Sequence, residues 1–150
     1  MKDQRQMIPV VGLLATGVAA VYMVVQLKGQ ASAPSADFTH AALAEVRDAQ
    51  GQVVLSGQFQ VADEDDDDVE RKAMLAPTGV DADATGEAEV EFSRDAPAVQ
   101  EVEFSIRNVS PNTTFTFAID GTTVATATAD ARGRTEIEVD VRMPGTTASR

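Results

Sequence analysis

Hydrophobic and polar residues alternate with a period of two over most of the chain beyond residue 40. Such alternation predicts β-strands that bury one face. The pattern is clearest over residues 87–93, where Ala88, Val90 and Phe92 share one face and three glutamates share the other. It predicts further strands over residues 43–47, 52–61, 71–75, 99–109, 115–119, 122–128 and 135–142.

Turn residues separate these segments every 8–15 positions. The strongest of these signals is Asp120-Gly121, because this dipeptide favours the two-residue turn of a β-hairpin. Residues 94–98 provide another reversal, between the strands at 87–93 and 99–109. Seven or eight strands over about 105 residues match the size of one immunoglobulin-like domain. We therefore expect an all-β fold, a single antiparallel β-sandwich of immunoglobulin-like type.

The N-terminal part of the chain carries a different pattern, a run of 19 uncharged residues from Met7 to Val25. A helix that spans a bilayer needs about 20 apolar residues, so the run predicts one transmembrane helix. Three basic residues and one acid lie within residues 1–28, whereas residues 29–150 hold nine basic and 23 acidic residues. The positive-inside rule then predicts a single-pass protein of the cell membrane, with a cytoplasmic N-terminus and an extracytoplasmic C-terminal domain.

The chain therefore divides into three parts. We expect a signal-anchor at residues 1–28, a flexible stalk rich in Ala, Ser and Pro at residues 29–40, and an acidic β-sandwich domain at residues 41–150. Within the domain, a disordered acidic loop is expected near residues 62–70 and a frayed end at residues 143–150. A signal peptide has a shorter apolar region of about 7–15 residues, which favours a retained anchor. The small residues Ala31-Ser32-Ala33 keep cleavage and secretion open as the alternative.

Composition narrows the chemistry further. The chain has no cysteine, which excludes disulfides, thiolate metal sites and a cysteine nucleophile. Its formal charge of -12 argues against nucleic acid as a partner, since such binding needs Lys and Arg to neutralise phosphates. The one histidine, His40, has no second ligand nearby and is interpreted as a solvated or packing side chain.

These exclusions favour a binding or structural role over an enzyme. We expect a module of the cell envelope that works through protein–protein or cation contact, with no catalytic residue and no cofactor other than Ca²⁺. The alternative is a hydrolase that uses a pair of carboxylates.

Two groups of carboxylates are candidate Ca²⁺ ligands, because Ca²⁺ prefers oxygen ligands. The acidic run at residues 63–68 includes Asp65 and Asp67, although such a run is also typical of a solvated loop. Asp81 and Asp83 begin a stretch similar to the first half of an EF-hand loop. The twelfth position of that loop, normally a glutamate, is Phe92, so only a looser site is expected there.

A third group of carboxylates would lie on one sheet face. A tight hairpin at residues 94–98 would pair position 91 with 101 and position 89 with 103, which places glutamates directly opposite one another. Like charges in that arrangement destabilise a sheet. The face is either an ordinary solvated surface relieved by Arg94, Arg107 and Arg142, or a surface for cations, salt or a basic partner. Its expected members are Glu89, Glu91, Glu101, Glu103, Glu136 and Glu138.

Part of the chain resembles a known family. Leu75 followed by the stretch DATGEAEV at residues 83–90 is similar to the opening of bacterial CHRD-type sandwich domains. The turns Asp120-Gly121 and Asp130-Ala-Arg-Gly133 resemble those of small exported bacterial β-domains, and the resemblance covers residues 73–142. It implies an exported β-sandwich. The histidine-containing segment of CHRD domains is absent, so the resemblance implies no ligand.

Overall fold

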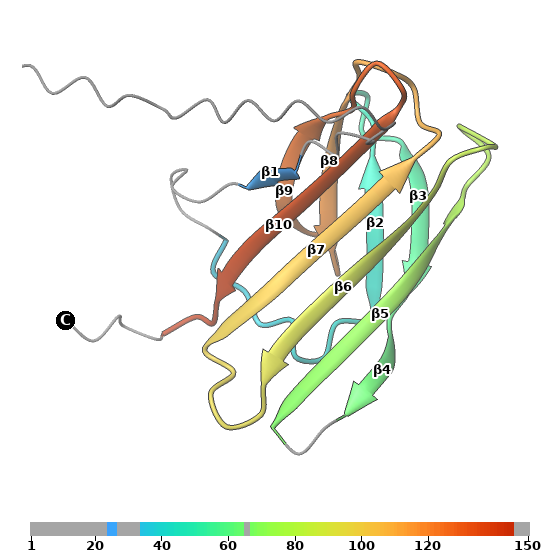
Figure 1. Ribbon diagram of the computed structural model, residues 1–150. Coiled ribbons are helices and arrows are strands. Elements are labelled where there is room, and N and C mark those ends of the chain that lie inside the picture. The colour runs from blue at the N-terminus through green and yellow to red at the C-terminus, as the bar shows by residue number, and fades with distance from the viewer. Residues whose placement is uncertain (1–23, 27–33, 65–66, 146–150) are drawn as a thin grey trace, which may run out of the picture.

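The computed structural model describes residues 24–26, 34–64 and 67–145, and these residues form an all-β fold (Figure 1). The all-β part of the predicted fold class is thereby confirmed, and no helix occurs within the described ranges. The strands are β1 (Val24–Gln26), β2 (Leu43–Arg47), β3 (Val53–Gln58), β4 (Gln60–Glu64), β5 (Asp68–Pro77), β6 (Thr85–Ser93), β7 (Val99–Arg107), β8 (Thr114–Ile119), β9 (Thr122–Thr128) and β10 (Arg134–Arg142).

The strands join into one sheet that folds back on itself. Its order is β1-β10-β7-β6-β5-β3-β2-β8-β9, with β4 paired to β5 beside this path. The pairing is antiparallel except between β1 and β10. Only two residue pairs, Leu55 with Pro77 and Ser56 with Ala76, connect β3 to β5, and β9 comes back against β10. The sheet is therefore nearly closed, and β5, β6, β7 and β10 form a layer in front of β3, β2, β8 and β9 (Figure 1).

The strand order differs from that of an immunoglobulin domain. There the first two strands share a sheet with the fourth and fifth. Here the first two strands of the described domain, β2 and β3, share a layer with β8 and β9. Alternation of apolar and polar residues predicts that a segment is a strand, but it carries no information about which strand lies beside it.

The core fills the space between the two layers. Phe104 on β7 and Phe117 on β8 meet there with ring centroids 5.2 Å apart and planes tilted by 59°. Such tilted aromatic pairs contribute about 0.5–1.5 kcal/mol beyond the burial of their area. Leu55, Ile106 and Ile137 are also almost fully buried. Most inward positions of these strands are the apolar positions of the sequence pattern.

The hairpin predicted at Asp120-Gly121 joins β8 to β9. Both residues have positive φ, 48° and 79°, as this type of turn requires. The Asp120 carboxylate accepts hydrogen bonds from the backbone amides of Ala42 and Leu43, the latter at 2.8 Å. The turn therefore also fixes the start of β2.

Residues 34–40, the second half of the predicted stalk, belong to the folded domain. Phe38 is buried in the core, with only 2% of its surface exposed. Its amide donates to Oε1 of the buried Gln100 at 2.6 Å, and Nε2 of Gln100 donates to the carbonyl of Ala36 at 3.3 Å. Ser35 pairs with Arg142. The prediction of a flexible linker is wrong for this half, because one buried phenylalanine anchors a stretch whose composition is otherwise typical of a linker. At the other end of the domain, Met143 donates its amide to the carbonyl of Ala98 at 3.0 Å.

The predicted transmembrane helix falls mostly outside the described residues. Residues 1–23 and 27–33 are not described, and the helix stays a prediction for residues 7–23. Val24 and Val25, the last two residues of the apolar run, lie in β1 opposite Glu136 and Ile137. The predicted helix, expected to reach Val25, can therefore extend no further than residue 23. Over the part of the chain that the structure describes, no helix is long and apolar enough to cross a membrane.

Candidate functional site

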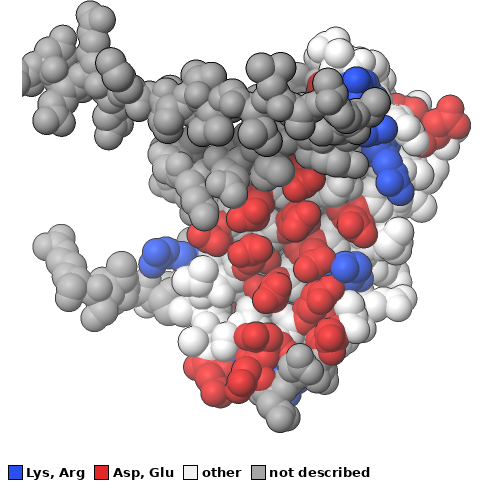
Figure 2. All heavy atoms as spheres, in the orientation of Figure 1, with Lys and Arg blue, Asp and Glu red and all other residues white. Residues whose placement is uncertain are grey.

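Carboxylates cover the outer surface of the front layer, as Figure 2 shows. The register of β6 with β7 places Glu89 opposite Glu103 and Glu91 opposite Glu101, which confirms the predicted hairpin. The pairing of β7 with β10 continues both rows to a third strand. We call this surface the acidic face; its members are Glu70, Glu87, Glu89, Glu91, Glu101, Glu103, Glu136, Glu138 and Asp140.

Two rows of carboxylates run across the strands of the acidic face. One contains Glu89, Glu103 and Glu138 in directly opposed positions. The other contains Glu91, Glu101 and Asp140 and continues on β5 with Glu70. Neighbouring strands lie about 4.8 Å apart, so successive carboxylates in a row repel one another at short range.

Lys72 provides a cation at the β5 edge of the acidic face. It lies opposite Glu89, and its Nζ is 3.0 Å from Glu70 Oε1 and 3.0 Å from Glu89 Oε2. These hydrogen bonds, first to Glu70 and then to Glu89, raise the pKa of Lys72 above its ordinary value. Lys72 thus neutralises the edge of the face and leaves its centre negative.

Glu103 occupies that centre, between β6 and β10. Partial burial raises the pKa of its carboxyl, and repulsion from Glu136, Glu89 and Glu138 raises the pKa further. A carboxyl whose pKa is higher in the folded than in the unfolded state opposes folding when ionised. This destabilisation is fully present above the folded-state pKa and disappears as the pH falls to the unfolded-state value. A bound cation would relieve the same repulsion.

The arginines expected to relieve the acidic face lie at its margins. Arg107 is opposite Arg134 at one end of β7 and β10, beyond Glu136, and its Nε donates to Thr85 Oγ1 at 3.2 Å. Arg142 lies opposite Val99 at the other end of the same strands. Arg94 follows β6 in the loop. Arg107 and Arg142 therefore lie beyond the two rows, at the ends of the strands, whereas Lys72 forms ion pairs with Glu70 and Glu89 within the acidic face.

The acidic run at residues 63–68 lies largely in a β-hairpin. Asp63 on β4 is opposite Glu70 on β5, and residues 65–66 lie outside the described part of the chain. The carbonyl of Asp67 accepts hydrogen bonds from the Arg94 amide at 2.8 Å and from Ser93 Oγ at 3.2 Å. The expected disordered loop near residues 62–70 is corrected here: strand pairing accounts for residues 62–64 and 68–70.

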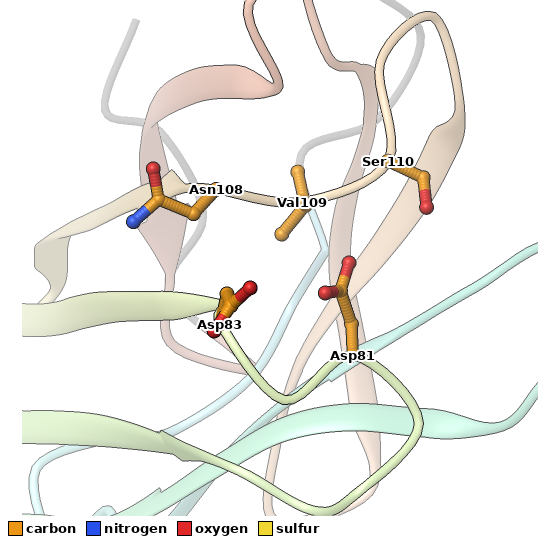
Figure 3. Close-up of a pocket in the computed structure, with 5 residues that line it drawn as sticks. All are labelled: Asp81, Asp83, Asn108, Val109 and Ser110. Carbon is orange, nitrogen blue, oxygen red and sulfur yellow. The ribbon is translucent and has the colours of Figure 1, made fainter.

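Asp81 and Asp83 line a shallow hollow between two loops (Figure 3). The loop from β5 to β6 carries both carboxylates, and the segment after β7 contributes Asn108, Val109 and Ser110. Asn108 adopts a positive φ of 57°. No cluster of three or more His, Asp or Glu side chains that could hold a metal is present in residues 24–26, 34–64 and 67–145. The hollow therefore supplies two carboxylates, not a complete EF-hand ligand set.

The structure separates the two predicted groups of Ca²⁺ ligands. Asp67 precedes β5, whereas Asp81 and Asp83 follow it. Because β5 has ten residues and a strand rises about 3.3 Å per residue, the two groups lie at opposite ends of an element about 30 Å long. Asp67 therefore cannot join Asp81 and Asp83 in one site, and Asp65 lies outside the described residues.

No protein-family model, curated protein or solved structure matches this chain. The resemblance to CHRD-type domains stays a prediction, and the candidate site rests on its own geometry.

Replacing Glu103 by glutamine tests the electrostatics of the acidic face. Glu103→Gln removes the central charge and should raise the free energy of unfolding at pH 7 by about 0.5–1 kcal/mol. The gain should shrink as the pH falls to about 4, because Glu103 is then largely protonated in both states. Urea unfolding at several pH values measures it, with Asp95→Asn in an exposed loop as the control that removes one charge elsewhere. A loss of stability at pH 7, or the same gain from Asp95→Asn, would contradict this electrostatic account.

Proposed function

We propose that this protein is a non-enzymatic binding module whose acidic face takes up a basic segment of a partner protein, or cations held by its overall charge and not by a preformed cluster of metal ligands in the described residues. The observation that carries the proposal is the central row Glu89, Glu103 and Glu138, in which three carboxylates oppose one another on adjacent strands. A basic partner that inserts positive charges between these rows would gain attraction and also remove repulsion within the module.

Energetics favour binding over a merely solvated surface. Directly opposed like charges destabilise a sheet by roughly 0.2–1 kcal/mol per pair. The acidic face contains five such pairs: Glu70–Glu91 between β5 and β6, Glu89–Glu103 and Glu91–Glu101 between β6 and β7, and Glu103–Glu138 and Glu101–Asp140 between β7 and β10. A ligand that neutralises these opposed carboxylates would stabilise the fold by binding to it.

The placement of the carboxylates also favours contact over hydrolysis. A carboxylate-based glycosidase needs two carboxyl groups about 5–9.5 Å apart on either side of a bound substrate. The carboxylates of the acidic face lie side by side on the outer surface of a sheet (Figure 2). Such a surface is suited to a broad contact with a partner.

We further propose that the module is held at the outer side of the cell membrane by its N-terminal segment. Residues 7–23 remain uncharged after β1 is set aside, and 17 residues are about the shortest stretch that spans a bilayer. In this arrangement β1 would follow the membrane segment directly. The excess of basic residues before the apolar run and of acidic residues after it supports this orientation.

A cation titration tests the acidic face. We expect Ca²⁺ at millimolar concentration, or a short oligolysine peptide, to raise the Tm of the full chain in an uncharged detergent. Each kcal/mol of stabilisation by the bound ligand should raise the Tm by roughly 4 °C. The triple variant Glu89→Gln, Glu103→Gln, Glu138→Gln should lose most of this rise.

The hollow of Figure 3 provides the matched control. Asp81→Asn with Asp83→Asn removes carboxylates outside the acidic face and should leave the rise in Tm intact. If this double variant abolishes the response while the triple variant keeps it, the ions bind in the hollow and the proposal for the acidic face fails. If NaCl at the same ionic strength raises the Tm equally, the rise comes from general screening of charge, and the proposal of binding at the acidic face fails.

The membrane orientation is testable because the chain has no cysteine of its own. Thr122→Cys places a single thiol at an exposed position of β9, and Asp3→Cys places one before the apolar run. A membrane-impermeant maleimide added to intact bacterial cells should label the first variant and spare the second. Labelling of the second variant, or of neither, would contradict the proposed orientation. A labelled protein that lacks the N-terminal residues would indicate secretion after cleavage.

A further inference from the structure

A second pocket opens where β5 begins and β6 ends. Its volume is about 320 Å³, close to the lower limit for small-molecule sites. His40, Arg71 and Arg94 line it together with Thr39. The remaining walls are apolar, from Val69, Phe92 and Pro97.

Arg71 occupies a position where the strand pattern calls for an apolar residue. The inward positions of β5 are those of Val69, Ala73 and Leu75, all buried, and Arg71 lies between the first two. Its partner on β6 is Val90, which is fully buried. The guanidinium is therefore directed to the interior side of the sheet, away from the acidic face on the outer side.

The Nε of Arg71 is buried, and the described residues supply no hydrogen-bond acceptor for it. An unsatisfied buried donor is unfavourable, and in native proteins such groups call for a partner such as an ion or a ligand. A guanidinium offers donors in a planar fork that matches a carboxylate. The Arg71 side chain can therefore donate hydrogen bonds to an anion, and the described part of the protein supplies no acceptor for its Nε.

The neighbours of Arg71 strengthen this preference. The pocket combines two arginines with the one histidine of the chain, in a protein whose formal charge is -12. Arg94 already has an interaction within the protein, so Arg71 is the principal anion ligand and Arg94 adds positive charge at the rim. The Arg94 amide, bonded to the carbonyl of Asp67 at 2.8 Å, holds this rim against the start of β5.

We infer that this pocket binds a small organic carboxylate whose apolar body packs against Val69, Phe92 and Pro97. The carboxylate would pair with Arg71 and face Arg94 and His40. This site is independent of the proposed function, because it lies on the inner side of the layer and has the opposite charge preference. The apolar walls favour an aromatic or branched aliphatic acid over inorganic phosphate.

Benzoate is a suitable probe, and His40 is a built-in reporter. Because the chain has one histidine, every imidazole proton signal in the NMR spectrum comes from His40. A change in these signals therefore reports a change in the surroundings of His40. We expect benzoate to shift these signals saturably in the full chain in an uncharged detergent, and calorimetry to give the same Kd. Acetate and inorganic phosphate at equal ionic strength should bind at least about tenfold more weakly.

Two variants locate the site. Arg71→Leu replaces an unsatisfied donor by an apolar side chain and should fold normally, yet weaken benzoate binding by about tenfold or more. Arg94→Gln should weaken it less. Arg132→Gln, in the exposed turn between β9 and β10, is the matched control and should leave the Kd unchanged. The inference is overturned if benzoate causes no saturable shift, if all three variants bind alike, or if phosphate binds as tightly as benzoate.

Discussion

The antiparallel register between β6 and β7 is the constraint on which the rest of this molecule depends. It sets Val90 beside Val102 in the core and at the same time sets Glu89 opposite Glu103 on the outside. A slip of one residue would exchange the two faces and bury the glutamates. Burying a valine or phenylalanine side chain is worth about 1.5–3 kcal/mol. A pair of opposed like charges costs less than about 1 kcal/mol. The core therefore prevails, and the fold tolerates the opposed carboxylates as a consequence.

The same alternation directs two adjacent basic residues of β5 to opposite sides of the layer. Lys72 points outward and bridges Glu70 and Glu89, whereas Arg71 points inward and lines the pocket with His40. Two adjacent basic residues thus serve two surfaces with opposite preferences. In the proposals made above, the acidic face binds cations or basic groups and the inner pocket binds an anion. Both preferences follow from side chains that the period of the strand places on opposite sides of one layer.

The sequence allowed most of the strands, their inward faces and the β6–β7 register to be predicted, because alternation and turn residues are local signals. It did not predict β1, which lies in the predicted helix, or the division of residues 52–64 into β3 and β4. It could not predict the strand order, which depends on contacts between distant segments. It also missed Phe38, Gln100 and Arg71. Phe38 sits in a stretch with the composition of a linker, and the other two are polar residues at inward positions that only the folded neighbours explain. One signal in the sequence could have indicated that Arg71 points inward: it lies two residues from both Val69 and Ala73, and alternate residues of a strand share a face.

The central claim is that the register holds Glu103 ionised amid its neighbours at a cost that a cation relieves. An NMR titration of the Glu103 side-chain carboxyl carbon tests this claim most directly. The account predicts that the pKa of Glu103 lies above the ordinary value for glutamate, about 4.3, and falls when Ca²⁺ is added. A pKa at or below that value that does not respond to Ca²⁺ would contradict it.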